Sequence, residues 1–242
     1  MRKIICAVSV LIAGIAGQSY GENIELWGTS VSPYVRKVVN VLDYKKLGYH
    51  QKEILPLSLL KATGQDVPED FQKATVLGKI PLLTLGSQAI NDSSVIAAYL
   101  EKEYPGHAIY PKDSGLYADA LWLEKYSDTE LTEAIHPIFI ERVVKASVLG
   151  IESDEERVLH FVENKLPKVL SYLNNLIEEK GTYALVGDQL SIADFAVVNQ
   201  VIDLDASKIC WRDGSYPALE KYMNRMMGES FIQKTISSAL DI

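Results

Sequence analysis

Hydroxyl side chains cluster where a short apolar strand gives way to a helical pattern. Thr29, Ser30, Ser32 and Tyr34 all fall within six residues. Ser32 precedes Pro33, which is the expected start of a helix, because serine caps it and proline loses nothing at the first helical position. Such a start offers amide donors and partial positive charge, so a hydroxyl there can help to stabilise an anion. Ser32 is therefore the leading candidate, although a plain N-cap would use the same oxygen, and Ser30, Thr29 and Tyr34 are alternatives.

Two basic residues, Arg36 and Lys37, stand in the first turn of the same predicted helix. That end of a helix disfavours positive charge. We therefore expect either an anionic ligand close to them or a solvated helix face.

A second group of polar side chains lies in residues 78–105, GKIPLLTLGSQAINDSSVIAAYLEKEYP. The spacing predicts a short strand, a turn, a second strand and then a capped amphipathic helix. Asp92 and Ser93 stand at the start of that helix, where both residue types are good caps. Lys79 and Pro81 stand in the turn before the hairpin, and a proline there is a candidate for a cis peptide bond.

Composition limits the classes of function. The net charge of −8 over 242 residues disfavours a nucleic-acid partner, because phosphate binding needs a basic face. The two cysteines, Cys6 and Cys210, form no CxxC pair, and the four histidines are scattered. We therefore expect no metal site, no dithiol redox pair and no permanently bound cofactor.

Residues 1–21 have the pattern of a secretory leader. Two basic residues precede an apolar run, 4–16, that is too short to span a bilayer comfortably. Ser19 and Gly21 are small residues placed for a cleavage after Gly21. We expect an exported protein, periplasmic or secreted, with no integral membrane span in the mature chain; an uncleaved leader on a cytoplasmic protein is the alternative.

The rest of the chain divides at a turn-rich linker, residues 105–115. Residues 22–104 alternate short apolar strands with helical patterns, in a thioredoxin-like order. Residues 116–242 are helical in pattern almost throughout, with a break or restart at Pro167. The predicted fold class is therefore an α/β domain followed by an all-α domain.

The clearest local signal in the second domain is the segment LSIADF. Ser191 at the N-cap and Asp194 three positions later form a capping box, and Leu190 against Phe195 forms a hydrophobic staple. We interpret Asp194 as structural; a catalytic role is the alternative.

Four motifs, in this order, resemble signatures of the glutathione transferase family and together span nearly all of residues 24–240. They are SPYVRKV at 32–38, GKIP at 78–81, NDSSVIAAYLE at 91–101 and GDQLSIADFAV at 187–197. The first motif is most similar to serine-type, bacterial members. The resemblance implies that family's fold, a thioredoxin-like glutathione-binding domain followed by a helical domain.

The resemblance also implies a chemistry. Glutathione would be the co-substrate, and Ser32 would stabilise its thiolate for attack on a small hydrophobic electrophile, or for a related reduction or isomerisation. A thiol with a pKa near 8.5 is only about 3% ionised at pH 7, and lowering that pKa by two units requires about 2.7 kcal/mol of preferential stabilisation. A helix start with a hydroxyl offers such stabilisation, because its amide donors, its partial positive charge and the hydroxyl all favour a thiolate.

The same resemblance implies that five residues bind the rest of glutathione. Ile80 would present its backbone to the cysteinyl part, and Pro81 would be the cis-proline that exposes that backbone. Asp92 and Ser93 would bind the γ-glutamyl amine and carboxylate. Lys79 would bind the peptide backbone or the glycine carboxylate.

Two positions depart from the family pattern. Glutamate is usual where Asp92 stands, so we expect the shorter arm to reach less far. An Asn-Pro pair is common where this chain has Thr75-Val76, which we expect to reshape a loop.

The second-substrate pocket is expected between the domains, on the helix predicted over 116–148. Its candidates are Tyr126, Phe139 and Arg142, with His136 and Ile138 beside them, and ordinary helix packing is the alternative. Family members typically form two-fold dimers, so a homodimer is expected.

Two other functions compete with the transferase. Exchange through a protein thiol is disfavoured, because Ser32 and Val35 occupy the places where a CPYC motif would put its thiols. A non-catalytic binding or interaction protein on the same scaffold is the alternative that stays open.

Overall fold

The computed structural model describes residues 24–181 and 183–240, and only the backbone of 237–240. The leader expected at 1–21 lies outside these residues. No helix in the described part of the chain is both long and apolar enough to cross a membrane.

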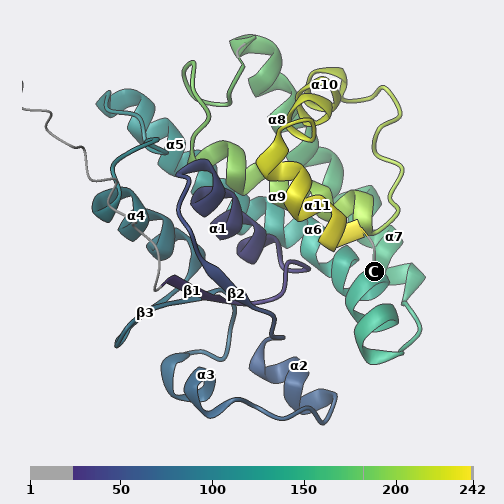
Figure 1. The fold of residues 1–242 in the computed structure, drawn as a ribbon. Coiled ribbons are helices and arrows are strands. Elements are labelled where there is room, and N and C mark those ends of the chain that lie inside the picture. The colour runs from purple at the N-terminus through teal and green to yellow at the C-terminus, as the bar shows by residue number, and fades with distance from the viewer. Residues whose placement is uncertain (1–23, 182, 241–242) are drawn as a thin grey trace, which may run out of the picture.

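The N-terminal part alternates strands and helices, as predicted (Figure 1). Its elements are β1 (Ile24–Trp27), α1 (Pro33–Tyr44), β2 (His50–Lys52), α2 (Leu57–Ala62), α3 (Glu69–Ala74), β3 (Leu82–Leu85), β4 (Gln88–Asn91) and α4 (Ser93–Glu103). The second strand is short and ends at Lys52, and helix α2 follows from Leu57. The buried side chain of Leu60 anchors α2 against Trp27 and Phe71.

The four strands form one mixed sheet in the order β2-β1-β3-β4. β1 pairs with β2 in parallel and with β3 antiparallel, and the β3–β4 hairpin is antiparallel. Because side chains alternate along a strand, Leu26 packs with α1 and α4, whereas its neighbour Trp27 packs with α2 and α3. Figure 1 shows the helical part of the molecule on the α1 side of the sheet.

The C-terminal part is all helical, which confirms the predicted fold class. Its elements are α5 (Ser114–Tyr126), η1 (Ser127–Leu131), α6 (Thr132–Phe139), η2 (Ile140–Leu149), α7 (Glu155–Asn164), α8 (Leu166–Lys180), α9 (Ile192–Ala206), α10 (Pro217–Met226) and α11 (Ser230–Leu240). The segments from α5 to η2 follow one another without a break, and η1 and η2 are π-helical. Pro167 lies in the first turn of α8, where the helix restarts.

Helix α9 is the centre of this part and packs against α1. Its predicted capping box is present: Asp194 is fully buried, and its carboxylate accepts from the Ser191 amide at 2.8 Å. The same carboxylate accepts from the Leu185 amide at 3.0 Å and from the Tyr222 hydroxyl at 2.7 Å. Asp194 thus ties α9 to α10 and to the loop that precedes α9.

Candidate functional site

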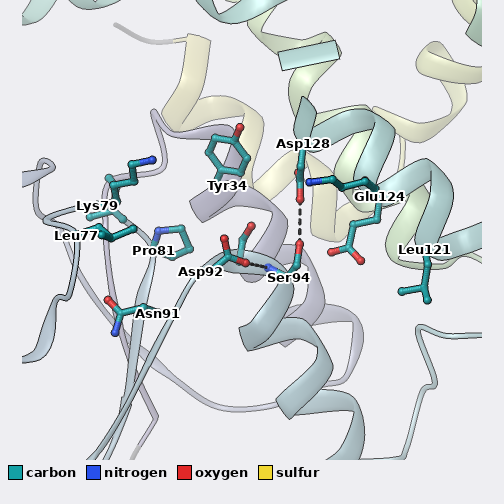
Figure 2. Close-up of a pocket in the computed structure, with 13 residues that line it drawn as sticks. Tyr34, Leu77, Lys79, Pro81, Asn91, Asp92, Ser94, Leu121, Glu124 and Asp128 are labelled. Carbon is teal, nitrogen blue, oxygen red and sulfur yellow. Dashed lines mark hydrogen bonds between the residues drawn. The ribbon is translucent and has the colours of Figure 1, made fainter. Parts of the chain in front are cut away.

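A cleft of about 570 Å³ lies between the sheet domain and helix α5 (Figure 2). It is lined by Tyr34, Leu77, Lys79, Ile80, Pro81, Asn91, Asp92, Ser93, Ser94, Leu121, Glu124, Lys125 and Asp128. All five residues that the sequence assigned to glutathione therefore line one cleft. Ser32, the candidate for the thiol, is not among the lining residues.

The turn before β3 forms one wall of the cleft. The Ile80–Pro81 peptide bond is cis. The Thr75 hydroxyl donates to the Lys79 carbonyl at 3.4 Å, while no backbone hydrogen bond found outside the helices and strands of the described residues involves Ile80. The peptide groups of Ile80 are therefore open to a ligand.

Gly28 allows this turn to approach the start of α1. A Cβ atom at Gly28 would lie 2.5 Å from Val35 Cγ2 and 3.3 Å from Ile80 Cβ. Its φ of 146° also favours glycine. The absence of a side chain at Gly28 brings the first turn of α1 next to Ile80.

The start of α4 forms the floor. Asp92 is the N-cap, with a φ of 77°, a backbone conformation that costs a non-glycine residue about 1–3 kcal/mol. Its Oδ1 accepts from the Ser94 amide at 2.9 Å and from the Val95 amide at 3.3 Å, the first of which Figure 2 shows. The Ser93 hydroxyl, by contrast, has no hydrogen-bond partner within the described part of the chain. Asp92 therefore already holds two of the amides at this helix start, and Ser93 remains available.

The opposite wall is a charged network that joins the two domains. The ammonium of Lys37 donates to Asp128 Oδ2 at 2.7 Å, to Glu124 Oε1 at 3.2 Å and to Ser94 Oγ at 3.1 Å. Ser94 donates to the same Asp128 oxygen at 2.9 Å (Figure 2). Ser94, Glu124 and Asp128 were not predicted from the sequence, where the four-residue spacing of the two acids on a helix was the only available signal.

One of the two expectations for Arg36 and Lys37, a solvated helix face, was wrong: Arg36 is 0% exposed and Lys37 is 1% exposed. The other, an anionic ligand close to the start of α1, stays a prediction. Each side chain is neutralised by carboxylates of the helical domain, Arg36 by Asp203 and Lys37 by Glu124 and Asp128. The ion pairs between domains compensate for placing two cations at the start of α1.

The four hydroxyl candidates have different environments. Tyr34 lines the cleft with its ring, but its hydroxyl shares a 2.9 Å hydrogen bond with Thr132 Oγ1, and burial raises the pKa of Tyr34. Thr29 lines a separate cavity next to Trp27. The buried Ser30 hydroxyl accepts from Gln51 Nε2 at 3.0 Å.

Ser32 differs from these three. It is the N-cap of α1, as predicted, yet its hydroxyl makes no hydrogen bond to the amides of that helix or to any other described residue. It is also only partly buried. Ser32 is therefore the candidate that stands at a helix start and whose hydroxyl has no hydrogen-bond partner among the described residues.

The residues expected around a second substrate do not gather in one place. Tyr126 packs against Tyr172, with ring centroids 4.6 Å apart, and Arg142 pairs with Glu155. Neither contributes to the cleft. Phe139 packs beside Val31 in the loop that precedes Ser32.

Two neighbours of Phe139 on helix α6 were also candidates. Ile138 is fully buried in the core, and the ring of His136 stacks on Phe139. Within the described residues, no three His, Cys, Asp or Glu side chains are grouped as metal ligands would be.

Comparison with known proteins identifies both parts of the chain. Residues 26–108 match the family model described as the glutathione S-transferase N-terminal domain, and residues 142–238 match the model of the C-terminal domain of the same family. A solved structure of glutathione transferase F7 from Populus trichocarpa is 20% identical and has a TM-score of 0.76, covering 89% of this chain and 99% of that one. That structural likeness establishes the fold.

Among curated proteins, glutathione S-transferase Z1 of Arabidopsis thaliana is 28% identical over 74% of this chain and 76% of its own length. The zeta-class glutathione S-transferase of Euphorbia esula is 26% identical over 66% of each chain. Maleylacetoacetate isomerase of Mus musculus is 24% identical over 65% of this chain and 68% of its own length. With both domain models of one family matched in order, this chain belongs to the glutathione S-transferase family of enzymes.

Proposed function

We propose that the chain binds glutathione in the cleft between β3, α4 and α5, and that Ser32 stabilises its thiolate. The observation that carries this proposal is that Lys79, the open backbone of Ile80 and the Ser93 hydroxyl all line one cleft. In this pose Ile80 would pair with the cysteinyl peptide groups. The cysteine sulfur would then point to the start of α1, which Gly28 allows to lie next to Ile80.

The ends of glutathione match the charges of the cleft. Its γ-glutamyl carboxylate would accept from the Ser93 hydroxyl and amide, and its ammonium would face Asp92 and Asp128. Lys79 would pair with a carboxylate at the other end. Because two amides of α4 are already capped by Asp92, Ser93 would bear most of the recognition of the γ-glutamyl carboxylate.

The thiolate would be stabilised by the start of α1. Ser32 leaves its own hydroxyl and the first amides of α1 uncapped, and together they would favour a negative sulfur. Tyr34 would not serve this purpose, because its hydroxyl is committed to Thr132.

We further propose isomerisation of an activated double bond as the reaction, with maleylacetoacetate as the first substrate to test. Relatives named maleylacetoacetate isomerase support this choice. The thiolate would form a C–S bond while the C=C electron pair moves onto an adjacent carbonyl oxygen. After rotation about the resulting single bond, the pair returns and the C–S bond breaks, which regenerates the thiolate.

The first test is calorimetric titration of the full chain with glutathione, together with the ultraviolet thiolate band of the complex followed against pH. We expect binding and a thiol pKa well below 8.5. S-methylglutathione is the control, since it should bind without producing the band. Ser32→Ala should raise the thiol pKa and abolish turnover, whereas Ser30→Ala should have a smaller effect on both, because the Ser30 hydroxyl is bonded to Gln51. No binding at millimolar glutathione would refute the assignments of Ile80, Asp92 and Ser93.

The absence of Ser32 from the cleft lining favours a second candidate, a non-catalytic binding protein on the same scaffold. Glutathione binding with an unperturbed thiol pKa and no turnover would support that candidate instead.

We also propose that two copies form a two-fold dimer. Val76 and Leu77, in the loop before β3, are 79% and 75% exposed, and Trp122 on α5 is 54% exposed. Light scattering after gel filtration should give twice the mass of the chain, and Val76→Asp with Leu77→Asp should give a monomer. Leu159→Asp, at a leucine on α7 that is 53% exposed, is the control and should leave the dimer intact.

A further inference from the structure

The loop that leads into α1 is held from inside the molecule by one arginine. Arg36 is fully buried, and its Nη1 donates to the Ser30 carbonyl at 3.0 Å and to the Val31 carbonyl at 2.8 Å. These are the two peptide groups immediately before Ser32. One guanidinium nitrogen therefore fixes the backbone that carries the Ser32 side chain.

The other donors of Arg36 cross to the helical domain. Its Nε donates to Asn199 Oδ1 at 3.2 Å, and its Nη2 donates to the Asn199 carbonyl at 2.6 Å. Nη2 also forms an ion pair with the fully buried Asp203. Both partners belong to α9, so the guanidinium links the central helix of one domain to the Ser32 loop of the other.

The rest of the loop is also fixed. Gln51 on β2 donates to the Gly28 carbonyl at 2.8 Å and to the Ser30 hydroxyl, and the Ser32 amide donates to the Thr29 carbonyl at 3.1 Å. The carbonyls from Gly28 to Val31 are thus all occupied. The Ser32 hydroxyl, free of bonds to described residues, projects from a backbone with little freedom to move.

We propose that Arg36 and Asp203 are positioning residues, which aim the Ser32 hydroxyl and the uncapped start of α1 at the thiol of glutathione. The inference rests on the proposed function and extends it to two buried residues that touch neither substrate. Asp203 orients the guanidinium, and the guanidinium orients the loop. Lysine could not replace Arg36, because an ammonium lacks the planar fork that spans two carbonyls and a carboxylate.

If the ion pair only stabilised the fold, its removal would leave the thiol pKa of bound glutathione unchanged. A double variant that lacks both charges distinguishes that role from positioning. Removing one partner of a buried pair leaves an unpaired charge and risks unfolding, whereas replacing both by apolar residues is often tolerated. Arg36→Met with Asp203→Leu should therefore fold but lack the loop contacts. Arg36→Lys is the second variant, since it keeps the charge.

The matched control is the ion pair at the other end of α1. Lys45 is also buried, pairs with Glu101 and donates to the carbonyls of Tyr104 and Gly106. Lys45→Met with Glu101→Leu removes a comparable clamp far from Ser32.

The measurement is the thiol pKa of bound glutathione in each full-length variant, with the melting temperature and the glutathione Kd measured alongside. We expect both Arg36 variants to raise the thiol pKa by about one unit, a roughly tenfold fall in the thiolate-to-thiol ratio. The Kd measured at pH 5.5, where bound glutathione keeps its thiol proton, should change less than about threefold, because neither residue touches glutathione. The Lys45/Glu101 variant should leave the thiol pKa at the parent value.

Two results would overturn the proposal. If the Arg36 variants bind glutathione with the parent's thiol pKa, the clamp is structural only, and the proposed function stands. If the parent itself shows no lowered thiol pKa, the proposed function fails and this inference fails with it.

Discussion

Lys37 Nζ lies 2.7 Å from Asp128 Oδ2, so the first helix of the sheet domain is ion-paired to the helical domain at the wall of the cleft. The same ammonium also reaches Glu124, and the Lys37 side chain is 1% exposed. One buried cation therefore joins α1 to two acids that line the cleft.

Replacing Lys37 by Met should lower the free energy of unfolding by about 3 kcal/mol, because it leaves two largely buried carboxylates without their counter-ion. Urea denaturation would measure the change. Lys125→Met is the control: that lysine is exposed on α5, and its loss should change stability by no more than about 0.5 kcal/mol. Equal losses in the two variants would show that the buried network does not stabilise the fold.

Ser93 and Ser94 are neighbours with different predicted effects on glutathione binding. Ser93→Ala should raise the Kd for glutathione roughly tenfold or more, the cost of losing a hydrogen bond to a charged group. Ser94→Ala removes a bond to Asp128 rather than to the ligand and should change the Kd only a few-fold. Titration calorimetry of both variants tests this order, and a larger effect for Ser94 would contradict the proposed pose.

The sequence predicted the fold and the cleft wherever the signal is local. The capped start of α4, the turn at Lys79 to Pro81 and the capping box of Asp194 each depend on residues close together in the chain, and each element is where it was expected. The hairpin brings the turn at Lys79 to Pro81 back to the start of α4, so that both ends of this segment, and not the strands between them, line one cleft.

Contacts between distant segments could not be predicted in this way. Arg36 and Asp203 are 167 residues apart, and a cation in the first turn of a helix gives no sign of which helix will neutralise it. Tyr126 and Arg142 fell on the expected helix, but nothing local shows that one packs against Tyr172 and the other pairs with Glu155. The π-helical segments that change the rotation of that helix also left no sequence signal.

Asp194 should be a stability residue without a catalytic role. Asp194→Ala removes a fully buried acceptor of bonds from Ser191, Leu185 and Tyr222, and should lower the free energy of unfolding by about 3 kcal/mol or more. Asp154→Ala removes an exposed cap that accepts from the Arg157 amide at 3.0 Å, and should lose only about 1 kcal/mol. Activity per folded molecule at low temperature should match the parent in both, and a specific loss of activity in Asp194→Ala would revive the catalytic alternative.

His136 should make stability depend on pH. Burial lowers the pKa of His136 below 6.5, and its Nδ1 has no hydrogen-bond partner among the described residues. On acidification the unfolded chain therefore binds a proton at His136 near pH 6.5, whereas the folded chain binds it only at a lower pH. The contribution of His136 to stability is therefore full above pH 6.5 and is lost as the pH falls. His136→Gln should accordingly lose less stability between pH 7.5 and pH 5 than the parent does, by urea denaturation at each pH. His160→Gln, at an exposed site on α7, is the control and should lose as much stability as the parent. If the free energy of unfolding falls equally in all three proteins, His136 is charged as readily in the folded chain as in the unfolded one.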